Sequence, residues 1–153
     1  MADGLALDFP GGAQLAAALR ELPEAVRGEI LATALVQGAL PIRDDAVTRA
    51  SVRRWPRRRP EKPPLAETIR TTIERIGREE AVVDVGSSSS IAHLVELGHE
   101  LVRGNRVVGH VAAYPFLRPA FDGGVEEAVA EIGASLGGEI EAAFRRLAPH
   151  EAE

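Results

Sequence analysis

The sequence predicts an α+β fold in one domain of residues 1–153: an N-terminal helical pair, a small and mostly antiparallel sheet, and a long C-terminal helix packed on that sheet. Apolar residues recur at helical spacing near both ends of the chain, and short β-favouring runs separated by turn residues occupy the middle. With 153 residues and a hydrophobic content of 45%, the chain is long enough to bury one core.

The N-terminal region contains signals for a strand and two helices. Residues 4–9 alternate loosely between apolar and polar, which predicts a short first strand. From Gln14 onward, apolar residues step by three or four positions, which is typical of an amphipathic helix. Because proline removes a backbone donor and clashes with the preceding turn, we expect this helix to end at Leu22 and a second helix to start at Pro23 and run to about residue 50.

Residues 51–64 differ in composition from the rest of the chain. They include four prolines, five arginines and Trp55, and they show no apolar periodicity. This composition predicts an extended, polyproline-like loop on the surface. Its basic side chains are candidate contacts for DNA in a lumen or for a neighbouring subunit: Arg53, Arg54, Arg57, Arg58, Arg59 and Lys62.

Charge is distributed unevenly along the chain. Residues 43–62 carry a formal charge of +5, whereas residues 122–153 carry −6. The basic loop could neutralise phosphates without reading bases, or it could dock on an acidic surface such as the C-terminal helix of another copy. The residues alone leave both alternatives open, so a sequence-nonspecific nucleic-acid-binding adapter is an alternative function.

The middle of the chain predicts two hairpins and a short helix. Residues 65–76 mix helical spacing with β-favouring Ile and Thr, and residues 81–85 are typical of a strand, which together predict a hairpin that begins with a helical turn. Residues 91–97 predict a short helix with Gly98 just beyond its end. Gly104 and the asparagine after it, between two apolar pairs, predict a second tight hairpin.

Residues 115–148 are the predicted C-terminal helix region, because apolar residues step along them by three or four positions. Gly133, Gly137 and Gly138 lie inside this region, and each weakens a helix by about 1 kcal/mol relative to alanine. We therefore expect these glycines to mark close packing, either against the sheet or against a neighbouring subunit.

The composition argues against several classes of function. The chain has no cysteine, which excludes disulfides, thiol nucleophiles and cysteine–zinc sites. No apolar run reaches the roughly 18 residues of a membrane span. His93, Glu96 and His99 lie at three-residue intervals, but this spacing matches no zinc-enzyme motif, so we expect polar surface or interface residues there. The sequence predicts no enzyme, no cofactor, no metal and no membrane contact.

Three segments carry a resemblance to a known family. Val-Asp-Val-Gly ends at Gly86, Ile-Ala-His-Leu-Val-Glu-Leu-Gly ends at Gly98, and Tyr-Pro-Phe-Leu-Arg-Pro-Ala ends at Ala120. Together they resemble the HK-ninety-seven-type (gp-ten-like) tail-component family of tailed phages, which are neck or tail-completion proteins. Residues 15–50 resemble the family's opening. The chain departs from the family pattern at Ile91, Leu97 and His99, where tyrosine, phenylalanine and threonine are usual.

The resemblance implies a non-enzymatic structural protein of a tailed-phage virion, located in the tail or neck and assembled in the host cytoplasm. It implies a homo-oligomeric ring at the head–tail junction, through which DNA passes, with six-fold symmetry favoured and twelve-fold also open. The implied partners are other copies of the chain, the connector or stopper, the tail terminator or the tail tube, and the genome in the lumen.

The resemblance also singles out a structural or interface motif near the start of the C-terminal helix. Its members are Glu96, Tyr114, Phe116, Leu117, Arg118 and Pro119. We expect Phe116, Leu117 and Pro119 to anchor the helix where it leaves the sheet. We also expect an ion pair between Glu96 and Arg118 to brace this corner.

Overall fold

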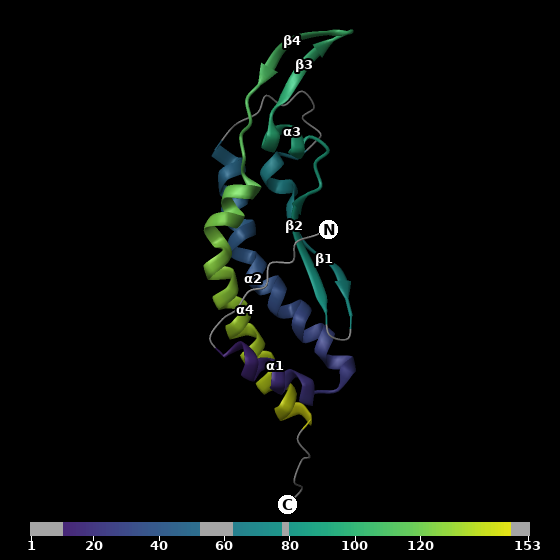
Figure 1. Cartoon of the computed structure of the whole chain (residues 1–153), viewed down its shortest axis with the longest axis vertical. Coiled ribbons are helices and arrows are strands. Elements are labelled where there is room, and N and C mark those ends of the chain that lie inside the picture. The colour runs from purple at the N-terminus through teal and green to yellow at the C-terminus, as the bar shows by residue number, and fades with distance from the viewer. Residues whose placement is uncertain (1–10, 53–62, 78–79, 148–153) are drawn as a thin grey trace, which may run out of the picture. The chain divides into compact units, whose positions relative to one another are not determined.

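The computed structural model describes residues 11–52, 63–77 and 80–147, and it confirms the α+β class (Figure 1). The predicted strand at residues 4–9 and the six basic residues of the Arg/Pro-rich loop lie outside the described residues. The elements in chain order are α1 (Gly12–Glu21), α2 (Glu24–Val52), the 3₁₀ helix η1 (Leu65–Thr68), β1 (Ile69–Ile76), β2 (Ala81–Ser87), α3 (Ala92–Leu97), β3 (His99–Arg103), β4 (Arg106–Val111) and α4 (Leu117–Leu147).

The break between the first two helices lies where the sequence predicts it. Leu22 leaves the helical conformation, with φ −77° and ψ 153°, and it is only 1% exposed. Pro23 separates it from α2, which begins one residue later than expected. A proline in this position cannot continue α1, but its restricted φ suits the start of a new helix. Pro41 lies inside α2 without ending it.

The strands form two separate two-stranded antiparallel sheets, β1–β2 and β3–β4, rather than the one sheet that the sequence led us to expect. Each pair is closed by its own short connection, and Gly104 adopts φ 61° in the second turn. The left-handed conformation at this position explains why glycine stands there. The 3₁₀ turn η1 before β1 confirms the predicted helical turn.

The described chain divides into two compact units, and both long helices contribute to each. The first unit contains the chain up to residue 40, residues 72–84 and the chain from residue 126. The second unit contains residues 41–71 and 85–125. The single domain expected from the sequence stays a prediction.

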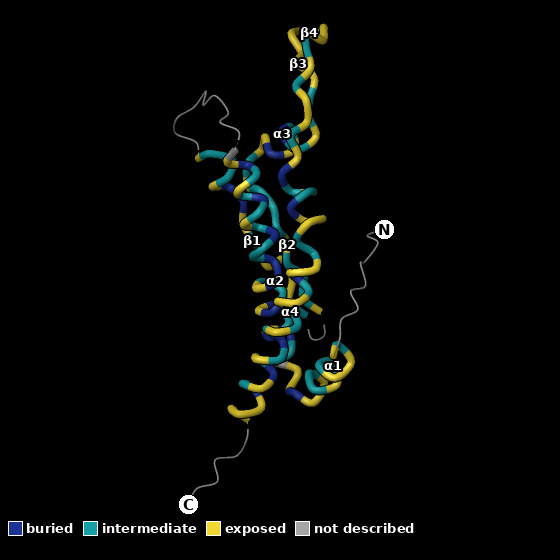
Figure 2. Tube along the Cα trace, turned by 90° about the vertical axis from the view of Figure 1, so that its left-hand side faces the viewer, coloured by how far each residue is buried: buried dark blue, intermediate teal, exposed yellow. Residues whose placement is uncertain are grey.

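The first unit has a helical core. Residues of α2 and of the C-terminal half of α4 cluster with Leu22, and α1 covers this cluster with its own apolar residues. Buried and exposed positions alternate along α2 and α4, as in amphipathic helices (Figure 2). The buried members are Leu22, Ile30, Ala34, Leu136, Ile140 and Ala143. Here α4 packs on helices, not on a sheet as we expected, because its apolar stripe meets those of α1 and α2.

Close helix packing in the first unit depends on a glycine that the sequence analysis did not single out. A side chain at Gly38 of α2 would overlap Ile132 of α4. By contrast, a Cβ at Gly137 would meet only Leu15 at 4.0 Å, and one at Gly138 would meet nothing within 4 Å. Within the described chain, these last two glycines do not mark the close packing that we expected.

The second unit buries residues from the end of α2, from η1 and β1, from α3, and from the start of α4. They are Ile42, Ala46, Ala50, Thr68, Ile69, Ala92, Val95, Phe116 and Ala120. Gly124 lets α4 approach α2 in this unit, since a Cβ there would lie 2.9 Å from Ile42 Cγ1. No helix among the residues described has both the length and the hydropathy that a membrane span requires.

Candidate functional site

The motif residues predicted from the sequence meet at one corner of the second unit. We call Glu96 together with residues 114–120 the Glu96 corner. Glu96 is near the end of α3, and residues 112–116 lead from β4 into α4. The backbone N–H of Tyr114 donates to the carbonyl of Val95 at 2.8 Å, which holds this linker against α3.

Gly98 makes the close approach between α3 and the linker geometrically feasible. It follows the last residue of α3 with φ 73°, in the left-handed region that favours glycine. A Cβ at this position would lie 2.7 Å from both the Ala113 nitrogen and the Val111 carbonyl oxygen. The predicted helix end at Gly98 is confirmed, and its glycine also makes room for the chain that leads into α4.

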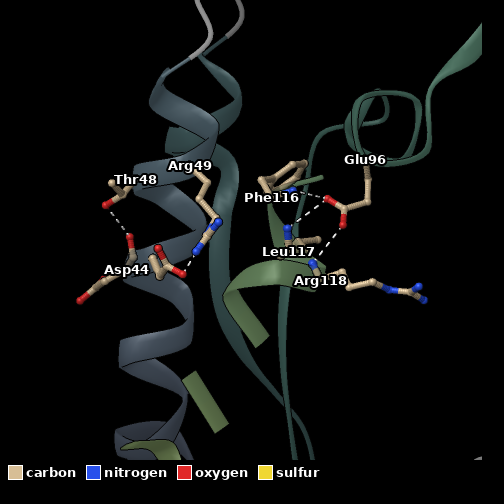
Figure 3. Close-up of polar contacts among 8 residues, drawn as sticks. Asp44, Thr48, Arg49, Glu96, Phe116, Leu117 and Arg118 are labelled. Carbon is tan, nitrogen blue, oxygen red and sulfur yellow. Dashed lines mark hydrogen bonds and ion pairs between the residues drawn. The ribbon is translucent and has the colours of Figure 1, made fainter. Parts of the chain in front are cut away.

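The carboxylate of Glu96 accepts hydrogen bonds from three successive backbone N–H groups at the start of α4 (Figure 3). Oε2 accepts from Phe116 at 2.7 Å and from Leu117 at 3.0 Å, and Oε1 accepts from Arg118 at 3.0 Å. Glu96 lies 20 residues before Phe116, so it caps α4 from a different element of the chain. Phe116 stands at the usual N-cap position and has no side-chain oxygen with which to cap the helix itself.

Pro119 completes the accounting of backbone donors at this helix end. The first four N–H groups of an α-helix have no partner within the helix. In α4 these positions are residues 116–119, because the helix begins at Leu117. Glu96 accepts from the first three, and proline has no N–H at the fourth. No donor of this first turn is therefore left without a partner.

The environment lowers the pKa of Glu96. Partial burial of the carboxyl would by itself raise this pKa. The three backbone N–H donors and the positive charge of Arg118 outweigh that effect, and the pKa lies below its ordinary value of 4.5. The helix dipole acts in the same direction, because it favours a negative charge at the N-terminus of α4.

The expected ion pair between Glu96 and Arg118 is not what braces this corner. Arg118 contacts the carboxylate through its backbone N–H, while its guanidinium points away from Glu96 (Figure 3). The reason is geometric: the first-turn N–H groups of a helix point along its axis toward the carboxylate, whereas the side chains point outward. The sequence resemblance paired the right residues but assigned the wrong atoms.

The remaining motif residues differ in exposure. Phe116 is 0% exposed, Leu117 and Pro119 are half-buried, and Tyr114 is half-buried in the linker. Ala120, one turn after Phe116, is also 0% exposed. This is the arrangement expected of an anchor that holds the first turn of α4 in the second unit.

An open hollow of about 510 Å³ lies beside the corner. Its lining is mostly apolar, with one acid and one base: Ile42, Val85, Leu117, Arg118, Phe121 and Asp122. The side chain of Phe121 is 50% exposed there. The large apolar side chain of Phe121 is therefore exposed in this hollow, at the surface of the second unit.

Two other polar side chains of the second unit, those of His99 and Ser87, have structural partners. His99 Nδ1 lies 3.3 Å from the carbonyl oxygen of Leu94, and the Glu96 carboxylate is occupied by backbone donors. In the part of the chain that the structure describes, no group of three or more His, Asp or Glu side chains could hold a metal ion. Ser87, the last residue of β2, bonds to η1, with 2.7 Å between Ser87 Oγ and Thr68 Oγ1.

Comparison with protein families identifies the relatives of this chain. Residues 13–98, more than half of its length, match the model described as "Bacteriophage HK97-gp10, putative tail-component". The chain belongs to this HK97-gp10-like family. The match includes Glu96 and ends before the Phe116 turn. Comparisons with curated proteins and with solved structures found no match.

Family membership agrees with the resemblance found in the sequence, and it makes the chain a bacteriophage tail component. Reasoning from the sequence missed the three-donor cap, because a glutamate 20 residues away is not a local capping signal. One signal could have suggested it: an N-cap phenylalanine followed by a first-turn proline leaves the helix without a local cap.

Proposed function

We propose that this tail component is a non-enzymatic neck or tail-completion protein that forms a homo-oligomeric ring at the head–tail junction, through which DNA passes. Membership of the HK97-gp10-like family is the observation that carries the proposal. In this proposal the protein assembles in the host cytoplasm and binds the connector or stopper, the tail terminator or the tail tube.

The Glu96 corner supports a structural role for the motif residues. A carboxylate at the N-terminus of a helix could act as a base or a metal ligand in an active site. The Glu96 oxygens, however, already accept three hydrogen bonds. A group held in this way orients α4 relative to α3 within the second unit. It is suited to holding a helix in place and not to exchanging protons with a substrate.

Deletion of the gene from the phage that encodes it tests the proposal. We expect full heads and separate tails to accumulate, and wild-type protein supplied in trans should restore joined particles. Negative-stain images and mass spectrometry of purified particles provide the measurement. Joined, infectious particles that lack the protein would overturn the proposal.

The nucleic-acid-binding adapter makes a different prediction. Each phosphate contact of a basic residue contributes about 0.9 to the slope of log K against log salt on duplex DNA. A free monomer that binds duplex with a steep salt dependence, and loses it when the arginines at 53, 54, 57, 58 and 59 become glutamine, would favour the adapter. Joining of heads to tails that survives these substitutions would separate the two functions.

A further inference from the structure

The β3–β4 hairpin, which we call the arm (residues 99–111), exposes most of its apolar side chains. Val102, Val107 and Val108 are 61%, 59% and 61% exposed, and Leu101 is 44% exposed. Figure 2 shows the arm mostly in the colour of exposed residues, in contrast to the buried positions of α2 and α4. The arm therefore presents an apolar surface that the described chain does not cover.

The apolar residues lie on both faces of the arm. Val102 pairs with Val107, and Leu101 pairs with Gly109, with a register shift between Leu101 and Val102. Successive residues of a strand point to opposite faces, so Leu101 and Val102 lie on different faces. A sheet with one face in water alternates polar and apolar residues, whereas strands covered on both faces are apolar on both. Exposed apolar side chains therefore lie on both faces of the arm, beside charged residues.

The backbone of the arm also lacks neighbours. In the described part of the chain, no third strand pairs with β3 or β4, so both edges of this sheet are open. A two-stranded hairpin without further packing is marginally stable in water. Both the side chains and the edges of the arm point to contact with another molecule.

The tip of the arm identifies the charge of its partner. Arg103 and Arg106 lie directly opposite each other across the strands, and both are exposed. Like charges opposite each other destabilise a hairpin. Neither arginine takes part in an ion pair among the described residues. An acidic surface on the partner would compensate both charges.

The chain itself carries such a surface on α4. Glu127 and Glu131 form a like-charge pair four residues apart, which destabilises a helix, and Glu126 lies next to Glu127 in the sequence. All three are exposed, and none takes part in an ion pair among the residues described. Four other acids of the long helices take part in ion pairs: Asp44 with Arg43, Asp45 with Arg49, Glu139 with Arg146, and Glu141 with Arg145.

We propose that the arm docks on a second copy of this chain, with Arg103 and Arg106 against the acidic segment 126–131 of the second copy's α4 and the valines against the small exposed side chain of Ala130 beside these acids. Different surfaces meet in such a contact, so it can repeat from copy to copy and close a ring. The inference rests on the proposed function, because a ring at the head–tail junction requires an interface of this kind.

Cysteine crosslinking tests the contact directly, since the chain has no cysteine of its own. One variant carries Val107→Cys on the arm and another carries Ala130→Cys between the acids of α4. We expect a short thiol-reactive crosslinker to join the two variants when they are mixed. A chain that carries both substitutions should give a ladder of covalent oligomers, whose largest closed product reports the number of copies.

The matched control replaces Ala130→Cys by Gln14→Cys, an exposed position on α1. Mixed with Val107→Cys, it should crosslink about as slowly as non-associating proteins. Efficient dimers of Val107→Cys alone would indicate arm-to-arm contact and would overturn the proposed geometry. Equal yields with Gln14→Cys and Ala130→Cys would also overturn it.

Charge reversal provides a second, independent test. The pair Arg103→Glu and Arg106→Glu should weaken self-association by about tenfold or more, and so should the pair Glu127→Arg and Glu131→Arg, because like charges then face each other. Combining all four substitutions should restore association. Arg70→Glu, an exposed charge on β1, is the control and should have little effect. Sedimentation velocity measures the association, and circular dichroism confirms that each variant folds.

The outcomes separate the docking contact from the proposed function. Self-association that neither reversal weakens, or a chain that stays monomeric in solution and gives no arm-to-helix crosslink in purified particles, overturns the docking contact. The proposed function still stands in either case if the protein is found in particles and is needed to join them. Conversely, crosslinking and charge rescue in a protein absent from particles support the docking contact and overturn the function.

Discussion

The Glu96 corner and the arm are adjacent in the sequence and belong to the same unit. They differ in how many of their polar and apolar groups find partners within the chain. At the corner, Phe116 is 0% exposed and every first-turn donor of α4 is accounted for. In the arm, Val102 is 61% exposed, and Arg103 faces Arg106. The corner is complete within one chain, whereas the arm leaves apolar and charged side chains exposed.

This difference separates two kinds of residue in the second unit. Substitutions at the corner should act on the stability of the single chain, because its contacts are all internal. Substitutions in the arm should leave that stability nearly unchanged and act on association. Four measurements of unfolding, ordered from the largest expected effect to the smallest, test this separation.

The largest effect is expected for Phe116→Ala. Truncation of a fully buried phenylalanine removes apolar contacts and leaves a cavity, which costs about 3–5 kcal/mol of unfolding free energy. Urea denaturation followed by circular dichroism measures it. Phe121→Ala, at a 50% exposed position in the next turn, is the control and should cost only about 1 kcal/mol. Equal losses at the two positions would mean that Phe116 is not the anchor.

Glu96→Ala should have the next largest effect. It removes the acceptor of three backbone N–H groups, and loss of a helix cap costs about 2 kcal/mol. The same urea experiment measures this loss. Glu100→Ala, an exposed glutamate four residues later, serves as the control and should change the unfolding free energy little. A Glu96→Ala protein as stable as the wild type would show that the cap does not stabilise α4.

The contribution of Glu96 should also depend on pH. Its pKa is lower in the folded chain than the ordinary value of 4.5, so its stabilising effect is fully present above that value and is lost as pH falls through the folded-state pKa. The difference in unfolding free energy between wild type and Glu96→Gln should therefore be constant near neutral pH and shrink in acid. Urea titrations from neutral pH down to about pH 3 measure it. A difference that is the same at every pH would contradict the lowered pKa.

The smallest effect on the single chain is expected in the arm. Val102→Thr and Val107→Thr change exposed side chains to others that also favour strands, and they should shift the unfolding free energy by no more than about 0.5 kcal/mol. Urea denaturation at a concentration where the protein is monomeric provides the measurement. A loss as large as that of Phe116→Ala would mean that the arm is packed within its own chain.

Local features of the fold could be predicted from the sequence with good accuracy. The break at Leu22, the helical turn before β1, the helix end at Gly98 and the turn at Gly104 all lie where expected. Each depends on the backbone preferences of proline or glycine, or on a few adjacent apolar residues. Such preferences act over a handful of positions and need no knowledge of distant contacts.

Predictions that depend on which elements meet were less accurate. One sheet was expected where two hairpins form, and α4 was expected on the sheet, although in the first unit it packs on α1 and α2. The pairing of Glu96 with Arg118 was expected between side chains, although the carboxylate binds the backbone. An apolar stripe predicts that one face of a helix is covered, but it does not predict which element covers it.

By itself, the sequence determined where the helices and turns begin and end, which family the chain resembles and how its charges are divided. Only the tertiary structure decided that a glutamate 20 residues away caps α4, that Gly38 and Gly124 rather than Gly138 allow close helix packing, and that the arm is left uncovered. The physical reason is the distance along the chain over which each interaction acts. Backbone preferences act between neighbours in sequence. A hydrogen bond to a distant carboxylate, or the coverage of an apolar face, exists only once the chain has folded.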